Sequence, residues 1–284
     1  MQTRLCSKEN ETIISRDNPF VIIGESINPT RRKRLIESLQ TGDFDYIEQL
    51  AQTQIDAGAD VLDINVGIPD GDEIALLRAV TEFIAERFDV PLCLDSANPQ
   101  ALAAALAVAP GKALVNSVNG EEKSLRAVLP IVREYGAAVI GLTIDDDGIP
   151  KDVEKRIAIA EKIVERAAQH GISSDDVIID PLAMAVSADD KAAGVTLQAV
   201  DLISKHLGVN VTCGASNVSF GLPDRHTVNQ AFLVLAVGAG VTCAISDPVK
   251  LAPIIRATDL ILGRDTYATR YIKHWRAHRP KEAT

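Results

Sequence analysis

The run "VIIGESI" (Val21–Ile27) is the first of eight short apolar or β-branched runs that alternate with longer amphipathic segments. Runs of this kind are typical of parallel strands buried on both faces, and the segments between them of crossover helices. The other seven runs are "VLDINV" (Val61–Val66), "PLCLDS" (Pro91–Ser96), "ALVNSV" (Ala113–Val118), "AAVIGLT" (Ala137–Thr143), "VIIDP" (Val177–Pro181), "VNVTCGAS" (Val209–Ser216) and "VTCAIS" (Val241–Ser246). Eight βα units in 284 residues predict an α/β protein with a closed (β/α)8 TIM barrel.

The connecting segments support this interpretation. Lys151–His170 has one apolar stripe at helical spacing and a charged opposite face, and a last helix is expected over roughly Gly263–Trp275, outside the barrel. An open doubly wound sheet would usually carry a glycine-rich dinucleotide turn after its first strand, and the sequence contains no G-x-G-x-x-G. We therefore expect one barrel domain over residues 19–284, preceded by a polar extension of residues 1–18 that lies outside or along it.

Composition narrows the class of function. A hydrophobic content of 46% is ample for a large core, and a formal net charge of −10 argues against a general nucleic-acid binder. The four cysteines, Cys6, Cys93, Cys213 and Cys243, form no C-x-x-C pair, and we interpret the last three as buried free thiols. No run resembles a secretory signal or a membrane span. These features predict a cytoplasmic protein, not bound to membranes, whose ligand is small or is another protein.

Polar side chains gather where the predicted strands end, which is where a TIM barrel builds its active site. Taken strand by strand they are Glu25, Ser26 and Asn28; Asp63 and Asn65; Asp95, Ser96 and Asn98; Asn116 and Asn119; Asp180; Ser216, Asn217 and Ser219; and Ser246 and Asp247. Buried carboxylates are costly unless they are hydrogen-bonded, so this set indicates either mutual structural hydrogen bonds or a ligand rich in donors.

The chemistry of this set favours a planar heterocycle over a metal. Carboxylates accept from ring N–H and amino groups, while asparagine amides both donate and accept, which suits a pterin ring. The five histidines, His170, His206, His226, His274 and His278, fall in helices or at helix ends, and no metal site is predicted.

These motifs carry a family resemblance. The stretches are "GESIN", "LDINVG", "LCLDSAN", "LVNSVNG", "GLTIDDDGIPKD", "IIDPL" and "GASNVSFGLPDR", in that order from about Val21 to Ala268. Together they resemble the methyltetrahydrofolate:corrinoid methyltransferases, pterin-binding enzymes related in fold to dihydropteroate synthase. The resemblance implies a dihydropteroate-synthase-like TIM barrel, folate as substrate, and a homodimer.

The resemblance also assigns roles to residues. It implies that Asp95, Asn116 and Asp180 hold the pterin ring, that Asn217 contacts the nitrogen bearing the methyl group, and that Arg225 lies near the folate. Secondary candidates from the strand ends are Glu25, Asn28, Asp63, Asn65 and Ser219. Phe220 departs from the pattern, since some relatives carry a polar residue there.

The implied reaction explains an asparagine at the end of a strand. N5 of methyltetrahydrofolate is a poor leaving group, and a hydrogen bond from Asn217 would stabilise it as the methyl group leaves for Co(I). The amide can present its donor or its acceptor without burying a permanent charge. Because the predicted barrel uses the whole chain, the cobalamin must be carried by a partner corrinoid protein.

Two other functions remain open. A dihydropteroate synthase would carry a Ser-Arg-Lys motif where this chain has Ser216, Asn217 and Val218, and a non-catalytic folate-binding module would have no need of Asn217.

The basic run Arg31–Arg34 would meet a folate glutamate tail or an acidic partner, or would simply begin a solvated helix. "DRHTVN" (Asp224–Asn229) resembles a cobalt-ligating motif but lacks its glycine, so His226 is interpreted as a residue of a helical first turn.

Overall fold

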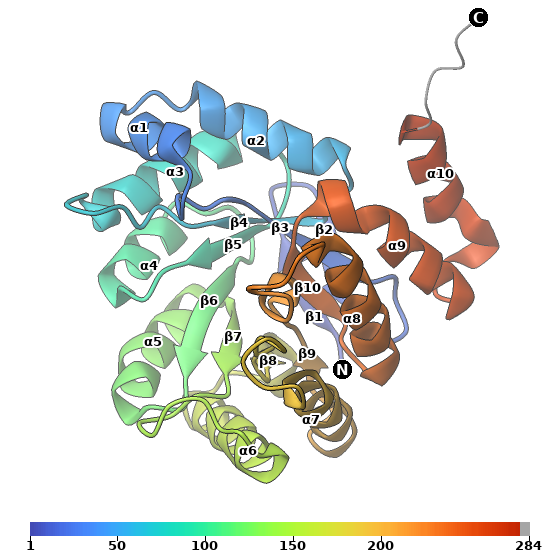
Figure 1. The fold of residues 1–284 in the computed structure, drawn as a ribbon. Helices are drawn as coiled ribbons and strands as arrows, with labels where there is room; N and C mark the ends of the chain where they lie inside the picture. Colours follow the sequence, from blue (N-terminus) through green and yellow to red (C-terminus); the bar gives the residue numbers. More distant parts are fainter. Residues whose placement is uncertain (279–284) are drawn as a thin grey trace, which may run out of the picture.

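A computed structural model describes residues 1–278 and shows a closed barrel of eight parallel strands (Figure 1). The strands are β3 (Val21–Ile27), β4 (Val61–Ile64), β5 (Leu92–Asp95), β6 (Leu114–Asn119), β7 (Ala138–Leu142), β8 (Val177–Asp180), β9 (Asn210–Val211) and β10 (Cys243–Ser246). They are hydrogen-bonded in the order β10-β3-β4-β5-β6-β7-β8-β9, and a parallel bridge between Gly214 and Ile245 joins the two ends. The predicted (β/α)8 barrel is therefore confirmed.

The helices surround the strands (Figure 1). They are α1 (Lys33–Thr41), α2 (Asp45–Asp56), α3 (Glu73–Arg87), α4 (Pro99–Leu106), α5 (Glu122–Tyr135), α6 (Val153–Gln169), α7 (Ala192–His206), α8 (Arg225–Ala239), α9 (Pro248–Ile261) and α10 (Thr269–His278), with 3-10 turns η1 (Ser174–Asp176), η2 (Ala215–Asn217) and η3 (Thr266–Ala268). The last helix begins six residues later than expected and packs on α9. The last six residues of the expected domain, 279–284, lie outside the described residues.

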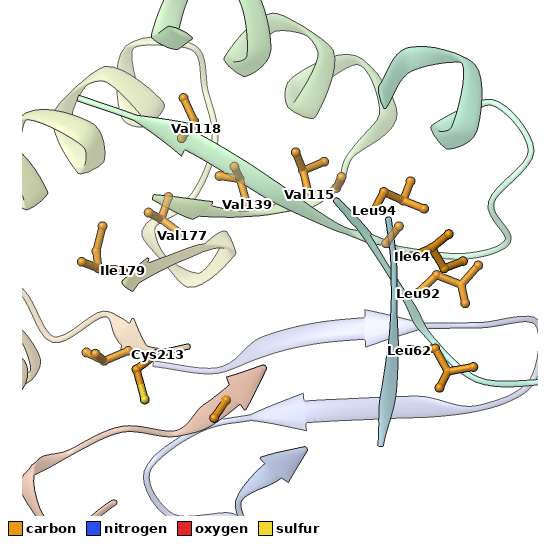
Figure 2. Packing of buried hydrophobic residues seen from close by; sticks show 14 of the residues in the cluster. Leu62, Ile64, Leu92, Leu94, Val115, Val118, Val139, Val177, Ile179 and Cys213 are labelled. Carbon is orange, nitrogen blue, oxygen red and sulfur yellow. The ribbon is translucent and has the colours of Figure 1, made fainter. Parts of the chain in front are cut away.

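Alternation along the strands divides the core into two parts. Side chains such as Leu62, Ile64, Leu92 and Leu94 belong to the cluster shared with the helices (Figure 2). Their neighbours in sequence point to the opposite face and fill the barrel with a smaller cluster: Val21, Ile23, Val61, Cys93, Leu114, Ala138, Ile140, Ile178 and Cys243. The next inward-facing position lies two residues further along each strand, toward its carboxyl end.

Residues 1–18 close the bottom of the barrel. They form an antiparallel hairpin of β1 (Thr3–Cys6) and β2 (Glu11–Ile14), and fully buried Leu5 and Ile14 complete the inner cluster. Gly111 accommodates the hairpin, since a Cβ there would lie 2.4 Å from the carbonyl oxygen of Cys6. The sequence predicted a polar extension but gave no sign that its two apolar side chains would seal the barrel floor.

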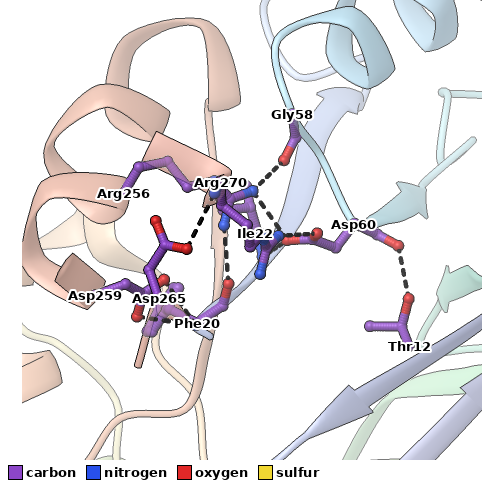
Figure 3. Close-up of polar contacts among 9 residues, drawn as sticks. All are labelled: Thr12, Phe20, Ile22, Gly58, Asp60, Arg256, Asp259, Asp265 and Arg270. Carbon is purple, nitrogen blue, oxygen red and sulfur yellow. Dashed lines mark hydrogen bonds and ion pairs between the residues drawn. The ribbon is translucent and has the colours of Figure 1, made fainter. Parts of the chain in front are cut away.

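A polar network fastens the last two helices to the same end of the barrel (Figure 3). Both oxygens of Asp259 accept from the backbone N–H of Phe20 at 3.0 Å. Arg256 donates to the carbonyl oxygen of Gly58 at 2.8 Å, and Asp60 pairs with Arg270 at 2.6 Å. Because Asp60 also accepts from the N–H of Ile22, one carboxylate joins α10 to the start of the first barrel strand.

The seventh strand is shorter than its apolar run predicted. Regular pairing covers only Asn210–Val211, and the predicted strand end over Cys213–Ser216 instead turns into η2. After Gly214, which still bridges to Ile245, the chain leaves the sheet and enters the turn that carries Asn217. The early end of this strand therefore brings the asparagine to the barrel mouth.

Candidate functional site

The mouth of the barrel is lined by the second inward layer of side chains. Two residues after an inward apolar residue, each of six strand ends carries a polar one: Ile23 is followed by Glu25, Val61 by Asp63, Cys93 by Asp95, Leu114 by Asn116, Ile178 by Asp180 and Ile245 by Asp247. Successive inward positions are two residues apart in a strand, so these polar groups form a ring above the apolar floor. This arrangement brings together Asp63, Asp95, Asn116 and Asp180, which the sequence singled out.

The strands β4, β5 and β6 contribute a hydrogen-bonded set of two carboxylates and two amides. The amide of Asn65 donates to Asp95 Oδ2 at 3.0 Å, and the amide of Asn116 donates to Asp63 Oδ1 at 3.3 Å. Asp63 is almost fully buried, whereas Asp95, Asn65 and Asn116 are partly exposed. The buried Asp63 therefore supports the set from below, and the other three side chains face the mouth.

Burial makes these carboxyls weak acids. It raises the pKa of Asp63, and the charge of Asp95 raises it further; burial likewise raises the pKa of Asp95. Two neighbouring acids, one of them buried, do not ionise together easily, so the pair retains a proton above the ordinary carboxyl range. The site can thus accept hydrogen bonds through one carboxylate without holding two buried charges.

This raised pKa predicts a pH dependence of stability that Asp63 controls. An acid with a raised pKa in the folded state contributes stability that is complete below its ordinary pKa, near 3.8, and is lost as the pH rises through the folded value. We expect Asp63→Asn to reduce the fall in the free energy of unfolding between pH 4 and 8, by about 1 kcal/mol or more. Urea unfolding at a series of pH values measures this.

The exposed loop residue Asp146 provides the control, because Asp146→Asn should leave the pH dependence unchanged. If Asp63→Asn and the parent protein lose stability in parallel as the pH rises, Asp63 does not hold a proton in the folded state.

Asp180 and Asn217 are linked through one glycine. Asp180 ends β8 and accepts from the backbone N–H groups of Leu182, at 2.7 Å, and Gly214; burial nevertheless raises its pKa to about 6. A Cβ at Gly214 would lie 2.9 Å from Nδ2 of Asn217, so the asparagine side chain lies directly over this glycine. Asn217 itself is exposed at the end of η2. The structure therefore places the expected ring-binding carboxylate beside the expected catalytic amide.

Arg225 braces the same loop. Its guanidinium donates to the carbonyl oxygen of Ser216 at 2.6 Å and to the hydroxyl of Ser219 at 3.0 Å. Ser216 also donates to Glu25 at 3.4 Å, and burial, followed by the charge of Asp247, raises the pKa of Glu25. Arg225 and Ser219 therefore shape the loop that carries Asn217, and Glu25 contacts the same loop through Ser216.

Two pockets open at the mouth. One of about 590 Å³ lies at the ends of β5 and β6, and its lining includes Asp95, Asn98, Asn116, Asn119 and Lys123. The other, of about 340 Å³, lies between β3, β10 and the Asn217 loop, and is lined by Glu25, Ser216, Arg225, His226, Asn229, Asp247, Lys250 and Leu251. Asp180 and Asn217 are not among the residues that line these two pockets.

The remaining motifs are placed as follows. Arg31 lies over the ring of Phe220, 5.9 Å from its centroid, so the basic run reaches the Asn217 loop. Asn28 accepts from the N–H of Thr30 and shapes the loop after β3. His226 is in the first turn of α8, as predicted.

Among residues 1–278, no group of His, Cys, Asp or Glu side chains is arranged to hold a metal ion. Within that same range, every helix is too short or too polar to span a membrane.

Sequence reasoning missed several residues at the mouth. Glu121 and Lys123 line the larger pocket from the start of α5, but on the sequence they read as an ordinary charged first turn. Arg156 and Leu182 contact the Asp180 turn and were not singled out. On the sequence Arg156 is one of several charged residues of the helix over Lys151–His170, and nothing there marks it as buried.

The protein is thus a TIM barrel whose mouth carries a ring of carboxylates and amides, with the side chain of the exposed Asn217 lying over Gly214. Residues 24–247 match the family model described as "Pterin binding enzyme". The chain belongs to this family.

Individual relatives agree with the resemblance seen in the motifs. The chain is 32% identical over 265 residues to the methylcorrinoid:tetrahydrofolate methyltransferase of Eubacterium limosum, covering 90% of this chain and 96% of that protein. It is 30% identical over 271 residues to the methionine synthase of Mycobacterium tuberculosis, covering 88% of this chain but only 23% of that protein. The expected resemblance to pterin-binding methyltransferases and the expected enzyme class, a methyltransferase, are confirmed.

Solved structures confirm the fold. Dihydropteroate synthases of Xanthomonas albilineans and Yersinia pestis both superpose with a TM-score of 0.68, at 20% and 19% sequence identity. The match covers 92% of this chain in both cases, and 99% and 100% of those chains. At these identities the likeness concerns the fold alone.

Proposed function

We propose that this protein transfers a methyl group between N5 of tetrahydrofolate and the cobalt of a corrinoid carried by a partner protein. The observation that carries the proposal is the Asp180–Gly214–Asn217 arrangement, in which a buried carboxylate and an exposed amide meet at the same glycine at the barrel mouth. The named methyltransferase relative, similar over nearly its whole length, supports the same reaction.

In this proposal the ring of polar groups holds the pterin. Asp95 and Asp180 accept from the N–H and amino groups of the heterocycle, and Asn116 supplies a complementary amide. Hydrogen bonds with a charged partner are worth roughly 1.5–3 kcal/mol each, so two carboxylates account for much of the affinity. Asp63 and Asn65 act on the ring through Asn116 and Asp95, to which they are hydrogen-bonded.

Asn217 acts on N5 in either direction of transfer. When the methyl group leaves the folate, the N5–CH3 bond breaks, the electron pair stays on N5, and the amide N–H of Asn217 stabilises it until N5 takes up a proton. In the opposite direction N5 loses its proton as it attacks the methyl group, and the amide oxygen accepts from that N–H. A corrinoid bound by the partner would supply Co(I) to take the methyl group, or methyl-Co(III) to give it in the opposite direction.

The proposal extends to the partners and location of the protein. The corrinoid protein docks at the mouth, where the basic residues Arg31 and Arg225 flank the exposed ring of Phe220. The protein works in the cytoplasm, in keeping with its three buried free thiols, and forms a homodimer. A light-scattering mass of one chain in dilute solution would contradict the dimer.

An anaerobic spectrum tests the reaction itself. Protein, methyltetrahydrofolate and chemically reduced free cobalamin are mixed, and loss of the Co(I) band and growth of methyl-Co(III) are followed. We expect catalysed conversion, absent when protein is omitted. If methyltetrahydrofolate binds but neither free cobalamin nor a corrinoid protein is methylated, the protein is a folate-binding module and the proposed reaction is wrong.

The dihydropteroate synthase reaction has no specific support in the site. Its diphosphate leaving group calls for cations, and Ser216, Asn217 and Val218 supply none. The one arginine on this loop, Arg225, is engaged with Ser216 and Ser219.

A further inference from the structure

Arg156 is buried beneath the mouth and bonded only to neutral groups. It projects from the first turn of α6, and its residue is 1% exposed. Its guanidinium donates to the carbonyl oxygens of Pro150 at 2.9 Å, Pro181 at 2.8 Å and Leu182 at 2.9 Å, and to the hydroxyl of Thr196 at 3.2 Å. A buried arginine is usually paired with a carboxylate, and none is among these acceptors.

The contacts of Arg156 converge on the turn that follows Asp180. Pro181 and Leu182 are the next two residues after Asp180, and the hydroxyl of Thr196 on α7 shares its hydrogen between the carbonyl oxygens of Ala192 at 3.0 Å and Leu182 at 3.2 Å. Helices α6 and α7 lie next to each other beside β8 (Figure 1). One guanidinium therefore joins the β7–α6 loop, the end of β8 and α7 around this turn.

Leu182 connects Arg156 to Asp180 directly. Its backbone N–H donates to Asp180 Oδ1 at 2.7 Å, while its carbonyl oxygen accepts from Arg156. Leu182 has a left-handed φ of 64°, which a branched side chain rarely adopts and which persists only where the surroundings enforce it. Arg156 and Thr196 supply that enforcement on the carbonyl side.

We infer that Arg156 is a positioning residue for Asp180: it fixes the Leu182 peptide so that its N–H meets the Asp180 carboxylate. Its positive charge also favours the ionised form of that carboxylate. The inference rests on the proposed function only in assigning Asp180 to pterin binding. It adds a residue from outside the mouth that sets the charge state of the ligand-binding acid.

The other titratable groups around Asp180 do not compete with Arg156. They are the thiols of Cys213, beyond β9, and Cys243, on β10. Burial raises the pKa of Cys213 and brings that of Cys243 to about 12, so both stay neutral while Asp180 titrates. Burial raises the pKa of Asp180 to about 6, against the N–H groups of Leu182 and Gly214 and the positive charge of Arg156, which lower it.

The first test is a carboxyl 13C NMR titration of Asp180 in the ligand-free protein, comparing the parent with Arg156→Gln. Removing the cation should raise the titration midpoint of Asp180 by about one pH unit or more. Ile163→Val, a core substitution on the same helix, controls for destabilisation and should leave the midpoint unchanged. An identical midpoint in Arg156→Gln and the parent overturns the inference.

Arg156→Lys separates charge from tethering and serves if Arg156→Gln does not fold. The ammonium keeps the charge but cannot reach all the carbonyl oxygens, so the Leu182 amide should exchange its hydrogen faster while the Asp180 midpoint moves less than in the glutamine variant. Unchanged exchange at Leu182 would show that Arg156 does not hold the turn.

The second test is calorimetric binding of methyltetrahydrofolate between pH 5 and 8. Because ionised Asp180 accepts from the ring, affinity of the parent should fall as the pH is lowered through about 6, and in Arg156→Gln the fall should begin at higher pH. A parent protein that does not bind folate at any pH contradicts the proposed function, whereas an unshifted profile in the variant contradicts only the role of Arg156.

Discussion

Asn217→Ala should lower the rate of methyl transfer by roughly tenfold to a thousandfold, the range seen when one hydrogen bond to a developing charge is lost. The fold should be unaffected, because Asn217 is exposed at the end of a 3-10 turn and its side chain fills no core space. Folate affinity should change little, because the amide stabilises the nitrogen mainly as the methyl group is transferred. Single-turnover measurement of methyl transfer at saturating folate isolates this step.

Two further variants make the test specific. Asn10→Ala removes an equivalent amide at the opposite end of the barrel, where Asn10 bonds to Asp89, and should leave the rate unchanged. Gly214→Ala places a methyl group 2.9 Å from the Asn217 amide nitrogen and should slow transfer by displacing the side chain that it meets. A normal rate in Asn217→Ala would exclude this residue from the chemistry.

Asp180→Asn should weaken binding of methyltetrahydrofolate by about tenfold or more. A carboxylate that accepts from a charged or strongly polar donor contributes more than a neutral amide oxygen, and the introduced NH2 group would also face the donors of the pterin ring. Asp95→Asn should act in the same direction. Titration calorimetry at pH 8, where the parent Asp180 is ionised, gives the largest difference.

The exposed Asp146, in the loop after β7, offers a carboxylate near the mouth for comparison, and Asp146→Asn should bind folate as the parent does. Unaltered affinity in Asp180→Asn would mean that the carboxyl serves only to accept from Leu182 and Gly214 and has a structural role.

Much of the fold was predictable because buried parallel strands leave a simple sequence signal. The run Val177–Pro181 is apolar up to Asp180, and the strand ends there. The same regularity places polar residues two positions beyond inward apolar ones, so Asp63 and Asp95 could be assigned to one end of the barrel from the sequence. The hydrogen bonds from Asn116 to Asp63 and from Asn65 to Asp95 could not be predicted from the sequence, because packing sets the register between strands.

Other features depend on contacts between distant segments. Nothing near Leu5 or Ile14 indicates that a polar extension turns back to seal the floor, since the partners lie on strands throughout the chain. Likewise Arg156 is one charged residue among several on its helix until three carbonyl groups from two loops are brought around it. Local patterns carry no information on such convergence.

The hairpin of residues 3–14 also determines how the protein can be handled. The backbone N–H of Gln2 bonds to Asp175 in the turn that precedes β8, so Gln2 lies at the end of the barrel remote from Asn217. An affinity tag or biotin attached there would hold the molecule on a sensor surface with its mouth facing the solution. Partner corrinoid proteins could then be screened against an immobilised barrel whose docking face is left clear.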